Sequence, residues 1–123
     1  MRVMLLGATG LVGGLALPML LDDPRCRAVV APTRRPLDLR DPKLHAPVLD
    51  FDQLPDAPGW APVDAVVCAL GSTMAQAGSR EAFYRIDHDY PLAFARLART
   101  QGARAFVLNS AAGANPGSAI FYS

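Results

Sequence analysis

The chain has 123 residues, of which 51% are hydrophobic and 19% charged, and its formal net charge is +1. This length suits a single domain over residues 1–123, and a chain this apolar can bury a core. The near-neutral charge argues against nucleic acid as the main partner, because phosphate backbones attract clustered positive charge. No apolar run approaches the roughly 20 residues that cross a bilayer, so no membrane partner is expected.

The first predicted elements are a buried strand and a helix. Val3–Leu6 is a continuous apolar run, which is typical of a strand covered on both faces of a parallel sheet. Leu11–Leu21 is predicted to be a helix, with apolar side chains that include Leu11 and Leu15. Pro18 lies inside this helix and is expected to kink it, because its ring meets a carbonyl of the preceding turn.

The middle of the chain is rich in proline and short in regular structure. Ala28–Ala31 is predicted to be the second strand. Frequent prolines between residues 37 and 62 forbid long helices, and Val48–Leu49 is predicted to be a short third strand. Asp64–Leu70 is predicted to be the fourth strand, with an apolar centre.

Two helices and a fifth strand complete the expected fold. Ser79–Ile86 is predicted to be a short helix, and Asp89–Gln101 a longer one with Asp89 as its N-cap. Ala105–Leu108 is predicted to be the last strand. Strands that alternate with helices indicate an α/β fold with a doubly wound parallel sheet, the Rossmann fold.

A glycine-rich turn joins the first strand to the first helix. Gly7 permits a tight turn, Gly10 lets the backbone approach a pyrophosphate, and Gly13 lets the helix pack close to the strand. The free amides that begin the helix then face the phosphate charge. The predicted binding residues of this turn are Gly7, Thr9, Gly10, Leu11, Val12 and Gly13. The alternative is a flavodoxin-like turn that binds another phosphate ligand, which preferential binding of FMN over NADPH would support.

The end of the second strand indicates which dinucleotide is preferred. Rossmann domains that prefer NAD place a carboxylate there to bind the ribose hydroxyls. This chain has no Asp or Glu between Asp23 and Asp38, and has Arg34 and Arg35 instead. A guanidinium can bind a 2′-phosphate with two hydrogen bonds. The sequence therefore predicts NADP(H) in preference to NAD(H), the alternative being that both arginines are solvated turn residues.

Several segments together resemble one enzyme family. They resemble the atypical and extended short-chain dehydrogenase/reductases, and within these the human Tat-interacting protein 30-like oxidoreductases and their bacterial relatives. The resemblance runs along the whole chain. The segments that carry it are Gly7–Gly13, Cys68–Thr73, Ala77–Phe83, Ile86–Asp87, Ser110–Ala114 and Ser118–Tyr122.

The resemblance implies roles for individual residues. Asp50 and Phe51 would lie near the adenine of the cofactor. The segment after the fourth strand would line the ribose and approach the nicotinamide, and it comprises Leu70, Gly71, Ser72 and Thr73. Ser110 would match the family's catalytic serine, and Tyr122 its catalytic tyrosine. In such enzymes the tyrosine exchanges a proton with the substrate oxygen, and a lysine four residues after it lowers its pKa.

The chain departs from this pattern at its end, because it stops at Ser123 before the lysine position. We therefore expect a fragment of a longer protein, whose full form would be an NADPH-dependent oxidoreductase or epimerase-like enzyme acting on a small carbonyl or alcohol. The alternative is a non-catalytic NADP(H)-binding regulatory or redox-sensing module. An incomplete sheet leaves apolar surface and a strand edge uncovered, so self-association is expected.

The cysteines and the first residues bear on metal binding and location. Cys26 and Cys68 are the only two cysteines, and they form neither a disulfide framework nor a metal-ligand spacing. No metal site is therefore expected. The apolar run before Gly7 is too short for a signal peptide, so the sequence predicts a cytoplasmic protein.

Overall fold

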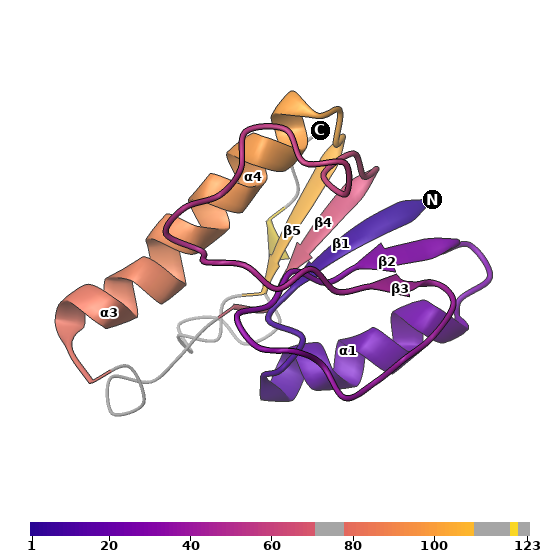
Figure 1. Ribbon diagram of the computed structural model, residues 1–123, viewed down its shortest axis with the longest axis horizontal. Coiled ribbons are helices and arrows are strands. Elements are labelled where there is room, and N and C mark those ends of the chain that lie inside the picture. The colour runs from indigo at the N-terminus through magenta and orange to yellow at the C-terminus, as the bar shows by residue number, and fades with distance from the viewer. Residues whose placement is uncertain (71–77, 110–118, 121–123) are drawn as a thin grey trace.

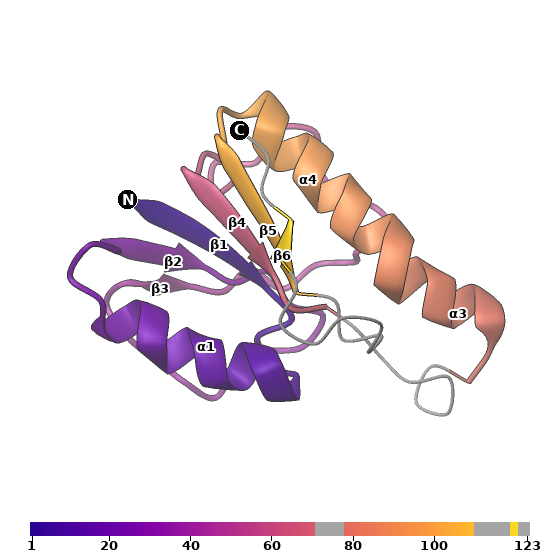
Figure 2. The same cartoon turned by 180° about the vertical axis from the view of Figure 1, so that it is seen from behind.

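A six-stranded sheet forms the centre of the molecule (Figure 1). The computed structural model describes residues 1–70, 78–109 and 119–120. The strands lie in the order β3-β2-β1-β4-β5-β6; all neighbours are parallel except β6, which runs antiparallel to β5 (Figure 2). The expected α/β Rossmann fold is confirmed. The strands are β1 (Arg2–Leu6), β2 (Ala28–Val30), β3 (Leu44–His45), β4 (Ala65–Cys68), β5 (Ala105–Asn109) and β6 (Ala119–Ile120).

Helices cover the sheet from opposite sides (Figure 1). On one side lies α1 (Leu11–Asp22), which continues through Pro18 without interruption. On the other side α3 (Arg80–Tyr84), the π-helix η1 (Arg85–Asp89) and α4 (Tyr90–Thr100) follow one another as a single rod. None of the helices in the described residues is both long enough and apolar enough to span a bilayer.

The central strand β1 is buried on both faces. Val3 and Leu5 belong to the apolar cluster under α1, while Met4 and Leu6 belong to the cluster under α4. This alternation follows from the two-residue repeat of a strand, and it explains why the sequence of β1 is apolar throughout. Cys68 is fully buried in the α4 cluster, and burial raises the pKa of its thiol to about 11. The thiol therefore stays protonated at neutral pH and acts as a packing group.

The face of α1 that packs against the sheet is not the face that carries Leu11 and Leu15. Leu11 and Leu15 point outward, with 84% and 66% of their surface exposed. The buried residues of the helix are Gly13, Leu17 and Leu21, which follow one another at intervals of four. Gly13 sets this rotation, because only a residue without a side chain fits where α1 comes closest to the turn after β1.

The third strand lies earlier in the chain than Val48–Leu49, and that prediction is wrong. The strand is Leu44–His45, and Val48 forms only an isolated parallel bridge with Thr33. Pro47 stands between the two pairings and has no amide hydrogen to donate to the ladder. Its carbonyl still accepts a bond from the Thr33 amide at 2.9 Å, so the interruption is confined to one missing hydrogen bond and the chain stays alongside β2.

The helix expected to begin at Asp89 instead continues from α3 through η1, so the predicted N-cap is wrong. Asp89 has helical angles (φ −68°, ψ −44°) and forms no side-chain cap. The Tyr90 amide donates to the Arg85 carbonyl, five residues back. This wider turn gives room for the ring of Pro91, which would press on a carbonyl in a regular helix. Ser79 caps the rod, because its hydroxyl accepts a backbone amide hydrogen bond at 3.1 Å.

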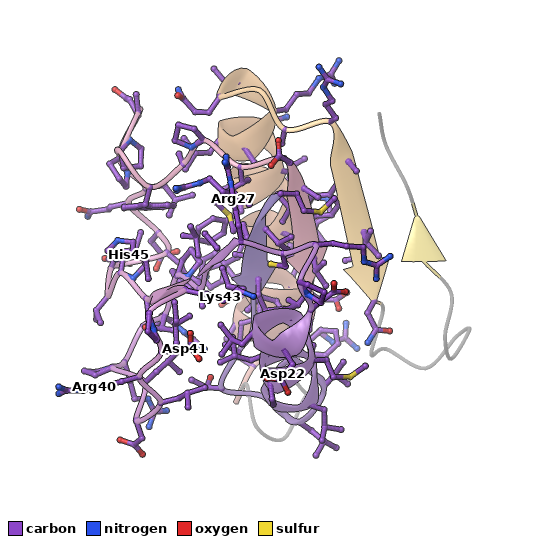
Figure 3. The ribbon with its side chains drawn as sticks, turned by 90° about the vertical axis from the view of Figure 1, so that its right-hand side faces the viewer. Asp22, Arg27, Arg40, Asp41, Lys43 and His45 are labelled. Atoms are coloured by element: carbon purple, nitrogen blue, oxygen red, sulfur yellow. The ribbon has the colours of Figure 1, made fainter. Side chains whose placement is uncertain are left out.

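Lys43, the only lysine of the chain, stabilises the end of α1. Its Nζ donates to the carbonyls of Leu21 at 2.8 Å and Asp23 at 3.2 Å. Figure 3 shows Lys43 directed toward α1 from the neighbouring edge of the sheet. The adjacent Arg25 side chain holds the pKa of the Asp23 carboxyl down at about 2 by hydrogen bonding. A cation at the C-terminal end of a helix suits the negative end of its dipole.

Candidate functional site

A cleft of about 350 Å³ lies where β1, β2 and β4 end. Parallel strands place their carboxyl ends along one edge of the sheet, and ligands bind beyond that edge where the strand order reverses. In this sheet the reversal lies between β1 and β4. The cleft brings together many of the residues singled out from the sequence, although these are far apart in the chain. It is lined by Gly7, Ala8, Thr9, Pro32, Thr33, Arg34, Arg35, Pro36, Phe51 and Leu70.

The glycines of the first turn permit close backbone packing. Gly7 has a φ of +85°, and a Cβ there would lie 2.6 Å from the carbonyl oxygen of Ala69. A Cβ on Gly13 would lie 1.8 Å from the carbonyl oxygen of Gly7, closer than any two such atoms can approach. The Gly10 amide donates to the same Gly7 oxygen at 3.0 Å and closes the turn. The expected conformational roles of Gly7 and Gly13 therefore agree with the backbone.

The start of α1 lies beside this turn. Gly10 is the N-cap, in an extended conformation and without a side-chain hydrogen bond. The amides of Leu11 and Val12 belong to the first turn, where helical amides have no carbonyl partner within the helix. Such amides, together with the positive end of the helix dipole, attract anions. Gly10, Leu11, Val12 and Gly13 do not line the cleft themselves.

The two arginines after β2 lie in the wall of the cleft and are exposed to solvent. The centre of the Arg34 guanidinium is 5.8 Å from the centre of the Phe51 ring, a cation–π distance. Within the described part of the chain, neither Arg34 nor Arg35 forms an ion pair. The lining also contains no Asp or Glu. This cleft therefore has positive charge near its mouth that no carboxylate of the described residues neutralises.

Phe51 connects the cleft to the core. Only 4% of its surface is exposed, and its ring meets Phe94 and Tyr90 edge-on at centroid distances of 4.9 and 5.6 Å. Burial raises the pKa of the Tyr90 hydroxyl, so Tyr90 is a packing residue that stays protonated. Asp50 is exposed and does not line the cleft; its carboxylate accepts a hydrogen bond from the Asp52 amide at 2.9 Å.

Sequence reasoning missed Thr33 as a residue of this site. Thr33 lines the cleft with only 3% of its surface exposed. Its hydroxyl oxygen has no hydrogen-bond partner among the described residues. The available signal was its position, because it is the polar side chain between the buried end of β2 and the Arg34–Arg35 pair.

Five of the predicted site residues cannot be placed. Gly71, Ser72 and Thr73 lie outside the described residues, as do Ser110 and Tyr122. The described part of the chain contains no group of three His, Cys, Asp or Glu side chains that could hold a metal ion.

A second hollow of about 560 Å³ lies between α4 and β5. Its floor is formed by apolar residues such as Val66 and Leu108, and its rim includes Arg96, Arg99 and Arg104. Every residue of β5 is only half-buried. This part of the sheet is therefore less covered than β1, which is packed on both faces.

Curated proteins of related sequence span the whole chain. It is 34% identical to Protein HTATIP2 of Rattus norvegicus over 98% of its length, and 31% identical to the mitochondrial protein FMP52 of Candida albicans over 99%. These matches confirm the resemblance to the Tat-interacting protein 30-like branch. The chain spans about half the length of these relatives, covering 51% and 56% of them.

Solved structures share the fold at lower identity. MoeE5 in complex with UDP-glucose and NAD superposes with a TM-score of 0.74 at 19% identity, covering 96% of this chain and 39% of that one. Uronate dehydrogenase from Agrobacterium tumefaciens in complex with NAD gives 0.67 at 18% identity, covering 87% of this chain and 39% of that one. Both neighbours hold NAD on the fold described above.

The relatives correct the expected cellular location. The FMP52 proteins of Candida albicans, Meyerozyma guilliermondii, Debaryomyces hansenii and Emericella nidulans are all named as mitochondrial. They contradict the cytoplasmic location inferred from the first residues. The reasoning failed because the lack of one kind of targeting signal does not determine a compartment.

The family assignment rests on a match that covers nearly the full length of this chain. The model of the NAD dependent epimerase/dehydratase family matches residues 3–120, from β1 through β6. This range includes the glycine turn, the strand-end arginines and the cleft that they line. The chain is therefore a member of the NAD dependent epimerase/dehydratase family.

Proposed function

We propose that the chain binds NADP(H) in the cleft after β1, β2 and β4, and prefers it to NAD(H). The observation behind this preference is that Arg34 and Arg35 line the cleft, while no carboxylate of residues 1–70, 78–109 or 119–120 does. A carboxylate at the end of β2 would bind the ribose hydroxyls of NAD and repel a 2′-phosphate. The two guanidiniums instead supply positive charge and planar donors for that phosphate.

The remaining parts of the cleft suit the rest of the dinucleotide. Gly7 and Gly13 let the strand, turn and helix backbones pack tightly, and Gly10 has only the Gly7 carbonyl oxygen within 4 Å of its Cβ position, at 3.4 Å. At Gly10 the backbone is therefore open to the close approach of a pyrophosphate. The first amides of α1 would donate to the pyrophosphate oxygens. Phe51 and Leu70 supply apolar wall for the adenosine, and in our proposal Asp50 lies nearby without contacting it.

The proposed reaction is oxidation or reduction of a small alcohol or carbonyl compound by the full-length protein. The bound nicotinamide would supply or accept hydride. By the family resemblance, Gly71, Ser72 and Thr73 would line the ribose and nicotinamide part of the site. Ser110 would orient the substrate oxygen, and Tyr122 would exchange a proton with it. The NAD-holding neighbours, one of which is named as a dehydrogenase, support this reaction class.

Arg34→Ala is expected to weaken NADPH binding by about tenfold to a hundredfold, because it removes charge-assisted hydrogen bonds to the 2′-phosphate. The affinity for NADH should change little, since NADH has a neutral hydroxyl in place of that phosphate. Calorimetric titration of both dinucleotides into both proteins measures the effect.

The matched control is Arg40→Ala, which removes the same charge from a side chain that points away from the molecule (Figure 3). Arg40 does not line the cleft, so both affinities should stay unchanged. If the unmodified chain binds NADH as tightly as NADPH, the proposed preference is wrong.

Self-association remains a prediction. The hollow between α4 and β5 and the half-buried β5 support it, because exposed apolar surface favours burial against another chain. We expect sedimentation velocity to show a mass that rises with protein concentration. A constant monomer mass over a hundredfold range of concentration would contradict the prediction.

A further inference from the structure

We propose that Thr33 is a specificity-determining residue, whose hydroxyl donates a hydrogen bond to the phosphate monoester on the adenosine ribose of the cofactor. This inference rests on the proposed preference for NADP(H) and adds a residue that neither the glycine pattern nor the arginine pair indicates. Three observations on the described residues lead to it.

The first observation is that two backbone hydrogen bonds to the segment after β3 hold the Thr33 backbone in place. Its amide donates to the Pro47 carbonyl at 2.9 Å, and its carbonyl accepts from the Leu49 amide at 2.9 Å. Both backbone groups are therefore satisfied, and the residue cannot shift without breaking two hydrogen bonds. Only rotation about the Cα–Cβ bond is left to direct the hydroxyl, among three staggered positions.

The second observation is that the hydroxyl is buried without a partner. Thr33 has 3% of its surface exposed, and its Oγ1 forms no hydrogen bond with the described residues. A buried hydroxyl that has lost its water and gained no partner destabilises the protein, so native structures rarely contain one without a reason. A valine has nearly the same shape and would avoid this cost. The hydroxyl is therefore expected to form its hydrogen bond when a bound ligand supplies an acceptor.

The third observation identifies the kind of acceptor. Thr33 lines the cleft next to Arg34 and Arg35, and no carboxylate lines it. Two neighbouring cations without a protein counter-charge favour an anionic group at this end of the cleft. Phosphate oxygens accept hydrogen bonds strongly, and a hydroxyl donor bound to them adds direction to the attraction that the guanidiniums supply.

The side chain of Arg34 is also restrained, by its contact with Phe51. Its guanidinium lies over the Phe51 ring, which is fixed by edge-on contacts with two core aromatic rings. Thr33 is fixed by the Pro47 and Leu49 backbone. Thr33 and Arg34 both line the cleft, and each is held by contacts that do not involve the other. Two residues that are already held in place lose less conformational freedom when a ligand binds.

The test compares Thr33→Val with Thr33→Ser, using fragments of the cofactor as probes. The probes are adenosine 2′,5′-bisphosphate, which has the 2′-phosphate, and adenosine 5′-diphosphate, which lacks it. We expect Thr33→Val to weaken binding of the 2′,5′-bisphosphate by about tenfold or more and to leave the 5′-diphosphate unchanged. Thr33→Ser keeps the hydroxyl and should retain the preference of the unmodified chain.

Thermal unfolding without ligand gives a second readout. Thr33→Val should unfold at the same temperature as the unmodified chain or higher, because it replaces an unpaired buried hydroxyl with a methyl group. A clear fall in unfolding temperature would mean that the hydroxyl has a partner within the fold, and would overturn the inference.

The remaining outcomes separate the two proposals. If the unmodified chain prefers the 2′,5′-bisphosphate and Thr33→Val keeps that preference, the role of Thr33 is overturned and the NADP(H) preference stands. Equal weakening of both probes by Thr33→Val also overturns it, since the hydroxyl would then contact a group that both probes share. If the unmodified chain shows no preference, the proposed function fails and the inference fails with it.

Discussion

Gly13→Ala is expected to unfold the chain or displace α1, and in either case to abolish dinucleotide binding. The added Cβ would lie 1.8 Å from the Gly7 carbonyl oxygen and 3.0 Å from the Cα of Ala8. Both are backbone atoms of the turn, so no side chain can move aside to relieve the clash. Relief requires α1 to shift away from β1, which separates Leu17 and Leu21 from the cluster that they help to bury.

Gly14→Ala is the matched control for this prediction. It adds the same atom one residue later in the same helix, where the nearest heavy atom is the Ala8 carbonyl oxygen at 3.7 Å. That is an ordinary contact, and alanine favours a helix over glycine by about 1 kcal/mol. Circular dichroism should therefore show thermal unfolding of Gly14→Ala at or above the temperature of the unmodified chain. Equal stability of the two variants would contradict the close approach of α1 to the turn.

Phe94→Ala is expected to lower the free energy of unfolding by about 3–5 kcal/mol, the usual cost of removing a fully buried aromatic ring. Phe94 has no exposed surface, and its ring supports Phe51 edge-on at 4.9 Å. Domains of this kind have about 5–15 kcal/mol of stability in total, so the loss is a large share. Urea denaturation measures it.

Leu92→Ala provides the comparison on the same helix. Leu92 has 40% of its surface exposed, so its truncation leaves a smaller cavity and gains helix propensity. The loss should be below about 1 kcal/mol, in the range of partly exposed positions. A loss for Phe94→Ala no greater than for Leu92→Ala would mean that the aromatic cluster of Phe51, Tyr90 and Phe94 does not stabilise the fold as described.

The parts of the fold that the sequence predicted correctly are those set by local backbone chemistry. The glycine spacing between Gly7 and Gly13 fixes a tight turn wherever it follows a buried strand, and the turn has the expected geometry. The buried runs of β1 and β4 are apolar because both faces of the sheet are covered. Proline frequency correctly indicated that residues 37–62 contain no long helix.

The errors arose where contacts between distant segments decide the outcome. The rotation of α1 depends on where Gly13 meets the turn, which outweighs the apolar character of Leu11 and Leu15. The position of β3 depends on which residues pair with β2, and Pro47 interrupts that pairing. A local rule for helix starts placed a cap at Asp89, whereas a preceding helix was already there.

The candidate site, like the fold, could be predicted in part from the sequence. Gly7 and Arg34 follow from rules for strand ends in dinucleotide-binding folds, and both line the cleft. The position of Thr33 beside the arginine pair was visible in the sequence, but its special feature was not, because that feature is a buried hydroxyl without a partner among the described residues. Packing information was needed to recognise it.

The position of β1 in the sheet has a consequence for biosynthesis. β1 leaves the ribosome before the other five strands of the described sheet, yet it lies inside the sheet and pairs with both β2 and β4. Its pairing with β2 can form once residue 30 has emerged, but its other edge has no partner until β4 (Ala65–Cys68) follows. During that interval an apolar strand with open hydrogen-bonding groups is exposed to other nascent chains. A chaperone that shields β1 during this interval should raise the yield of native protein more than one that acts after release.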